Sequence, residues 1–183
     1  MPKTLTLLRH AKSGWDDPVQ RDFDRPLNPK GRRAAATVGR HLKREGFAFD
    51  HVIASPALRV QQTLDEVAGG YGRAIEPNWD RRIYLASAAT LIDLIRELPD
   101  TAAAALLVGH NPGLEDLVLL LVPDAGPGAG GGPRDAVEEK YPTASVAELT
   151  FPVDRWTEVA EGGATLNRFV RPRDLDPSLG PDS

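Results

Sequence analysis

Short apolar runs alternate along the chain with longer segments whose apolar residues recur at helical spacing. Three of the runs predict buried strands because a polar residue or a glycine follows each of them: residues 5–8, 51–54 and 103–108. A weaker strand is expected at residues 73–76. Apolar residues at every second position predict two further strands on one edge of the sheet: residues 145–151 and 164–170.

Helical spacing is clearest between residues 29 and 45, where the apolar face consists of Ala34, Val38 and Leu42. Asn28 is expected to cap this helix and Pro29 to be its first residue. Further helices are predicted at residues 55–68, which a glycine pair follows, and at 89–98 and 111–121. Strands that alternate with helices predict an α/β fold, a three-layer α/β/α sandwich with a central, largely parallel sheet.

One domain is expected, over residues 1–171. Within it, residues 123–142 are predicted to be a flexible loop, because residues 123–133 contain five glycines and three prolines. The segment 172–183 has further prolines and a glycine and is expected to be a disordered tail.

The composition excludes several kinds of functional site. The 183 residues include no cysteine, which excludes disulfides, thiol nucleophiles and metal–thiolate sites. The apolar run near the N-terminus is too short for a secretory signal, and no run approaches the roughly 20 apolar residues of a membrane helix. We therefore expect a cytoplasmic protein without a membrane partner.

The charge is distributed unevenly. The chain has 22 Lys and Arg against 26 Asp and Glu, a net charge of −4, which argues against a nucleic-acid partner. The first 45 residues nevertheless carry eleven Lys and Arg and only five acids. A basic first quarter on an acidic body suits a small anionic ligand better than a long polyanion.

Candidate chemistry falls at three strand ends. Arg9 and His10 follow the first predicted strand, Arg59 lies in the first turn of the helix after the second, and His110 follows the third. In an open α/β sheet the ligand binds at the carboxyl ends of the strands, where helix N-termini also point. Each residue alone has an ordinary structural explanation, but together they predict a site for a phosphoryl group.

Three segments resemble the motifs of the histidine phosphatase superfamily. Residues 8–16 (LRHAKSGWD) are similar to its opening motif, residues 55–63 (SPALRVQQT) to its second and residues 108–113 (VGHNPG) to its third. Residues 24–31 (DRPLNPKG) and the short chain look most like the small bacterial phosphohistidine phosphatase branch. The resemblance covers residues 3–170 and implies an α/β/α sandwich.

The resemblance and the positions at the strand ends agree on residue roles. His10 is expected to be a neutral nucleophile that forms a phosphohistidine intermediate, which water then hydrolyses. Arg9, Arg59 and His110 are expected to bind the three equatorial phosphoryl oxygens, without a metal ion or cofactor.

Two secondary contacts and a general acid complete the expected site. Ser13 and Asn111 are expected to contact the phosphate, whereas Asp16 stands where many relatives have Asn. Relatives that hydrolyse esters have a Glu some distance after the second motif, and here Asp80 is the candidate acid. Asp80 has an equally weighted alternative, an ion pair with Arg81 or Arg82.

These residues predict a metal-independent phosphatase that acts on phosphohistidine of a protein. The short chain, which lacks long specificity insertions, favours a protein substrate. Two alternatives stay open. One is a phosphatase of small phosphate esters or pyrophosphorylated metabolites, and the other is an inactive phosphate-binding module. The sequence does not indicate an oligomeric state.

Overall fold

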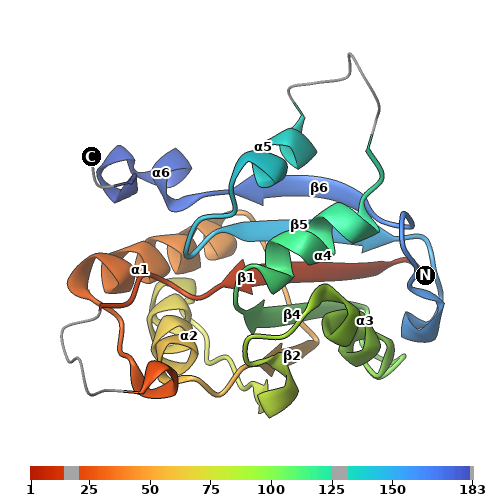
Figure 1. Ribbon diagram of the computed structural model, residues 1–183, viewed down its shortest axis with the longest axis horizontal. Helices are drawn as coiled ribbons and strands as arrows, with labels where there is room; N and C mark the ends of the chain where they lie inside the picture. The colour runs from red at the N-terminus through yellow and green to blue at the C-terminus, as the bar shows by residue number, and fades with distance from the viewer. Residues whose placement is uncertain (15–20, 125–131, 182–183) are drawn as a thin grey trace.

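The computed structural model describes residues 1–14, 21–124 and 132–181 (Figure 1). Six strands occur in it: β1 (Lys3–Arg9), β2 (His51–Ala54), β3 (Asn78–Trp79), β4 (Ala104–Gly109), β5 (Val146–Phe151) and β6 (Thr165–Val170). The α-helices of the described residues are α1 (Pro29–Arg44), α2 (Leu58–Tyr71), α3 (Ala88–Arg96), α4 (Gly113–Leu121), α5 (Pro133–Glu139) and α6 (Pro172–Leu175). Within these residues no helix is both long and apolar enough to cross a bilayer.

The strands form a single mixed sheet in the order β3-β2-β4-β1-β5-β6. The pairs β3·β2, β2·β4 and β4·β1 are parallel, whereas β5 and β6 are added antiparallel at one edge. The predicted α/β fold and its edge pair are therefore confirmed. Because β1, β2 and β4 are parallel, their carboxyl ends all reach the same edge of the sheet.

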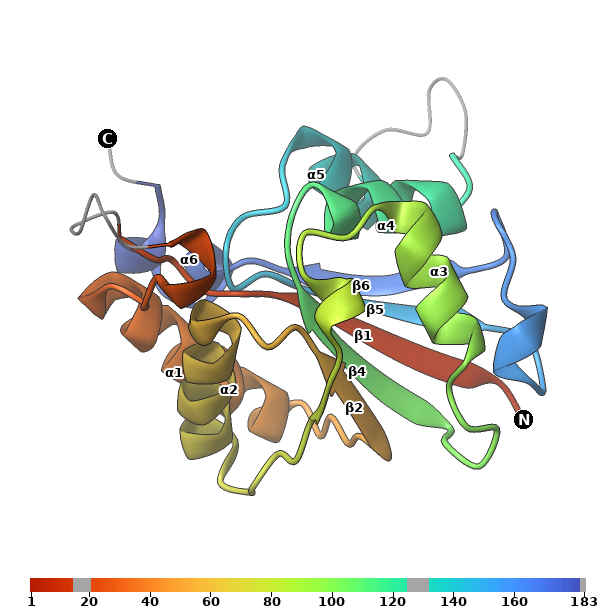
Figure 2. The same ribbon diagram turned by 60° about the horizontal axis from the view of Figure 1, so that its bottom comes forward.

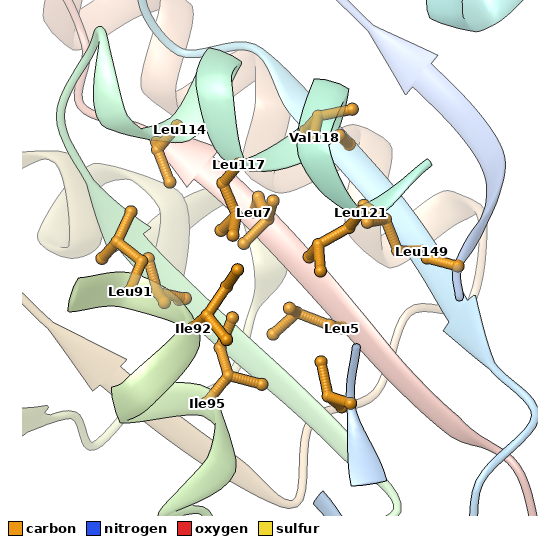
Figure 3. Close-up of a cluster of buried hydrophobic side chains, with 14 of the residues drawn as sticks. Leu5, Leu7, Leu91, Ile92, Ile95, Leu114, Leu117, Val118, Leu121 and Leu149 are labelled. Atoms are coloured by element: carbon orange, nitrogen blue, oxygen red, sulfur yellow. The ribbon is translucent and has the colours of Figure 1, made fainter. Parts of the chain in front are cut away.

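Helices cover both faces of this sheet (Figure 2). Alternate residues of β1 serve two cores: Leu5 and Leu7 join the cluster with α3 and α4, and Leu8 joins the cluster with α1 and α2. Figure 3 shows Leu5 and Leu7 among the leucines and isoleucines of α3 and α4. Both faces of the central strands are thus dry, as a parallel sheet requires.

Two predicted boundaries were wrong. The weak strand expected at 73–76 lies instead at Asn78–Trp79. The second helix begins at Leu58 rather than at Ser55, and it continues past the glycine pair to Tyr71, where Gly72 with φ of +77° ends it. Gly70 does not end the helix. A Cβ on Gly70 would lie 2.2 Å from the Ala36 carbonyl oxygen, so this glycine lets α1 and α2 approach closely.

The predicted loop and tail also differ from the structure. The second half of the loop, Pro133–Glu139, is the helix α5, whose Val137 is buried in the core; residues 125–131 lie outside the described part. The tail forms α6 and a 3-10 turn, Pro177–Leu179, and Leu179 packs against the α1–α2 cluster. The prolines that suggested a loop and a tail occupy the first positions of short helices, where no backbone N–H is needed.

The glycine pair gives a matched test of the α1–α2 contact. Gly70→Ala should lower the free energy of unfolding by about 1–3 kcal/mol, because the added methyl group forces α1 and α2 apart. Gly69→Ala should raise it by about 0.5–1 kcal/mol, because that position has open space and alanine favours a helix. Urea unfolding of both variants measures the difference. Equal effects would show that close packing is not the reason for Gly70.

Candidate active site

The two histidines of the predicted site lie side by side beyond the ends of β1 and β4. The parallel register pairs Arg9 with Gly109, so His10 and His110 occupy equivalent positions on neighbouring strands. Their ring centroids are 5.3 Å apart, and both residues are buried. The backbone N–H of His10 donates to the Gly109 carbonyl oxygen at 3.1 Å, which holds the two strand ends together beyond the sheet.

A backbone hydrogen bond fixes the tautomer of His10. Its Nδ1 lies 2.7 Å from the Ala11 carbonyl oxygen, which only accepts, so Nδ1 carries the proton and Nε2 keeps its lone pair. Burial lowers the pKa of His10 well below its ordinary value, and the nearby His110, Arg9 and Arg59 lower it further. His10 is therefore neutral at physiological pH, and Nε2 is the ring nitrogen that keeps its lone pair.

His110 is also held neutral, with the opposite tautomer. Arg59 Nη2 lies 3.3 Å from its Nδ1, and because a guanidinium only donates, Nδ1 must accept. Nε2 then donates to Ser55 Oγ at 2.7 Å. Burial and the positive charge of Arg59 lower the pKa of His110 to about 3. Ser55 belongs to the second sequence motif, and its contact with His110 explains why it lies outside α2.

The two arginines differ in how their charge is balanced. Arg59 is 2% exposed and donates to the Asp22 carbonyl oxygen at 2.7 Å and to Asp22 Oδ2 at 3.1 Å. Arg9 donates through Nη1 to the Tyr141 carbonyl oxygen at 2.8 Å and has no ion-pair partner within the described residues. The structure thus brings Arg9, His10, Arg59 and His110 to one edge of the sheet, as the sequence predicted.

Asp22 is a site residue that the sequence reasoning missed. Its carboxylate accepts hydrogen bonds from Arg59, from the Tyr84 hydroxyl and from Arg25, whose Nη2 lies 2.9 Å from Oδ1. Burial alone would raise the pKa of Asp22, but the bonds from Tyr84 and Arg25 and the charge of Arg59 outweigh it and lower the pKa to about 2. The run of charges at 21–25 was the available signal.

The two predicted secondary contacts are engaged with the protein itself. Ser13 Oγ accepts from Arg25, a buried arginine. Asn111 Nδ2 donates to the Tyr141 carbonyl oxygen at 3.0 Å, and its Oδ1 accepts from the Glu115 N–H at 3.2 Å in the first turn of α4. Both residues lie in the wall of the site, where they orient other groups. Asp16 lies outside the described residues.

Asp80 is engaged in an ion pair. Its carboxylate binds Arg82 through both oxygens, with the closest pair at 2.8 Å, and also accepts from the Arg82 backbone N–H. The hydrogen bond from the Arg82 side chain lowers the pKa of Asp80, which makes it a poor proton donor. Arg82 also binds Glu97. Of the two interpretations of Asp80, this geometry fits the ion pair.

A buried threonine ties the loop after β1 to α2. Thr63 Oγ1 accepts from the Ala11 N–H at 2.9 Å and donates to the Arg59 carbonyl oxygen at 2.6 Å. At Gly31, a Cβ would lie 2.1 Å from the Lys12 carbonyl oxygen, so α1 packs directly against the same loop. In the described ranges, no group of three or more His, Cys, Asp or Glu is placed to hold a metal ion.

Comparison with known proteins decides the family. The family model described as the histidine phosphatase superfamily (branch 1) matches residues 5–83. An uncharacterized protein of Mycobacterium tuberculosis is 35% identical over 166 residues, which cover 91% of this chain and 100% of that protein. The chain belongs to the histidine phosphatase superfamily.

Solved structures of this superfamily share the fold over nearly the full chain. The putative phosphohistidine phosphatase SixA from Nakamurella multipartitia is 30% identical, with a TM-score of 0.79, and the match covers 94% of this chain and 97% of that one. The putative SixA from Agrobacterium tumefaciens is 26% identical, with a TM-score of 0.72, 93% of this chain and 99% of that one being covered. As a superfamily member this histidine phosphatase is a hydrolase.

The depressed pKa of His110 predicts how stability depends on pH. The folded protein binds fewer protons than the unfolded chain between the unfolded pKa and about 3, so stability is full above the unfolded pKa and falls as pH decreases towards 3. Between pH 7 and pH 5 the wild type should lose about 2 kcal/mol more than His110→Gln, which does not titrate. Urea unfolding at both pH values tests this, and equal losses would contradict it.

Proposed function

We propose that this histidine phosphatase hydrolyses phosphohistidine on a protein, without a metal ion, through a covalent intermediate on His10. The observation that carries the proposal is the fixed tautomer of His10. Its Nδ1–H is bonded to the Ala11 carbonyl oxygen, so Nε2 is free to attack while Arg9, Arg59 and His110 surround it.

The first step transfers the phosphoryl group. Nε2 of His10 forms a bond to phosphorus as the bond from phosphorus to the substrate nitrogen breaks. The other ring nitrogen of the substrate carries a proton, so the electron pair leaves with a neutral imidazole. Arg9 and Arg59 then hold the equatorial oxygens, where their fixed positive charges stabilise the negative charge of the transition state. His110, whose Nε2–H is bonded to Ser55, holds Arg59 in place by accepting its hydrogen bond. Water breaks the new bond in the second step and restores Nε2.

The leaving group supports phosphohistidine over an ester. An alkoxide needs a proton as it leaves, but Asp80 is paired with Arg82, and Asp22 has a pKa of about 2 and is ionised. Imidazole is a weaker base than an alkoxide and leaves with less help. The two SixA structures, described as putative phosphohistidine phosphatases, support the same substrate class.

Replacement of the nucleophile tests the activity. Wild-type protein should release phosphate from a phosphohistidine peptide in the presence of excess chelator, and His10→Ala should lose all measurable turnover while it keeps phosphate binding. ³¹P NMR follows the release. If wild type and His10→Ala are equally inert towards phosphohistidine and phosphate esters, the protein is a phosphate-binding module instead.

Two further variants separate transition-state stabilisation from proton donation. Arg59→Ala should lower kcat/KM at least about 100-fold on every substrate, because the equatorial oxygens are present whatever the leaving group. Asp80→Asn should lower it only slightly, and equally for an alkyl and an aryl phosphate, because the carboxylate is held by Arg82. A selective loss on the alkyl phosphate would restore Asp80 as the general acid. Circular dichroism controls for folding.

A further inference from the structure

A basic groove opens beside the phosphoryl site. It has a volume of about 420 Å³ and is lined by six cationic side chains: Arg9, Lys12, Lys30, Lys140, Arg171 and Arg173. No acidic residue is among the described residues that line it. Six like charges around one hollow repel each other, and an anionic ligand relieves that repulsion.

Four separate parts of the chain build this basic groove. Arg9 and Lys12 come from the end of β1 and the loop after it, Lys30 from the start of α1, and Lys140 from the segment after α5. The other two cations belong to the C-terminal segment around α6. That segment is held in place by the buried Leu179 and by the bond from Lys30 Nζ to the Gly180 carbonyl oxygen.

Part of the cationic charge is already used within the protein. Arg171 binds Asp174 at 2.9 Å, and Lys30 has the Gly180 carbonyl oxygen. Lys140 is exposed, and neither it nor Arg173 forms an ion pair within the described residues. Lys140 and Arg173 are therefore the side chains of the groove that can pair with an external anion.

Arg9 belongs to both the basic groove and the candidate active site. It lines the groove, and its charge also acts on His10, so one ligand can reach both the groove and His10 Nε2. The net charge of the whole chain is −4, so the cations of the groove contrast with an acidic average and favour contact with an acidic partner at this face.

We propose that the basic groove binds acidic side chains next to the phosphohistidine of a protein substrate. The proposal rests on the proposed function and specifies its substrate class: an acidic phosphoprotein surface. Within the described residues, Asp22 and Asp80 are both held by arginines, which already favours a phosphohistidine leaving group. In a protein, such a group carries neighbouring residues to the rim of the site. The carboxylates of those residues would pair with Lys140 and Arg173.

The test compares two phosphohistidine peptides that differ only in their flanks, glutamate in one and glutamine in the other. At low salt the wild type should show a kcat/KM about tenfold higher for the acidic peptide, the effect of two exposed ion pairs, and high salt should remove the preference. The double variant Lys140→Gln/Arg173→Gln should lose the preference at low salt. Its kcat/KM for an aryl phosphate should stay at the wild-type value.

A control variant has the same change of charge at the far end of α1. Lys43→Gln/Arg44→Gln alters two exposed cations in the last turn of that helix, away from the groove, and should keep the tenfold preference. If the wild type hydrolyses both peptides equally, the groove proposal is overturned while the phosphohistidine activity stands. If it hydrolyses the aryl phosphate but neither peptide, the proposed function itself fails.

A third arm separates a protein from a small molecule. It compares a small ester carrying a second phosphate with its monophosphate analogue. Equal treatment of these two esters, together with the peptide preference, supports the acidic protein surface. A preference for the bisphosphate that Lys140→Gln/Arg173→Gln abolishes, without any peptide preference, would assign the groove to a small anion and overturn the proposal.

Discussion

The parallel pairing of β1 with β4 is the constraint on which the site depends. Their register sets Arg9 beside Gly109, and the next residue of each strand is therefore a histidine at the same edge of the sheet. Both strands are buried on both faces, with alternate side chains committed to two different cores. A shift by one residue would send each core side chain to the wrong face, so the packing of the cores also fixes the distance between His10 and His110.

Burial affects the histidines and the arginines at this edge of the sheet differently. Removing water penalises the charged imidazolium, and His10 and His110 respond by losing their protons. A guanidinium is always charged in proteins, so Arg9 and Arg59 are cations in the same surroundings. One desolvated site therefore contains a free nitrogen lone pair and two fixed positive charges, the combination that attack on a phosphoryl dianion requires. Asp22 offsets part of that charge at Arg59 and Arg25, whereas Arg9 has no such partner in the described residues.

The C-terminal segment changes the surroundings of this core chemistry. It packs on α1 through Leu179 and adds Arg171 and Arg173 to a hollow that already contains cations from the first quarter of the chain (Figure 1). Three cations of the basic first quarter thus meet cations of the C-terminal segment on one face. Arg9 belongs both to the basic groove and to the candidate active site, so the proposed recognition of a substrate's flanks and the proposed stabilisation of its phosphoryl group share one side chain.

Local sequence determined much of this protein. Apolar periodicity located all the strands but β3 to within about two residues, and Asn28 and Pro29 marked the start of α1 because capping and proline geometry are local properties. Arg9, His10, Arg59 and His110 all follow parallel strands in the sequence. Because parallel strands end at one edge of the sheet, their proximity could be predicted.

Only the tertiary structure decided the rest. Asp22 binds Arg59, which is 37 positions away in the sequence. Gly70 allows two helices to pack closely and does not end α2. Asp80 forms an ion pair with Arg82. The prolines suggested a disordered tail, but residues 172–181 are held to α1 by a buried leucine and a lysine contact. Such distant contacts leave no periodic pattern in the sequence.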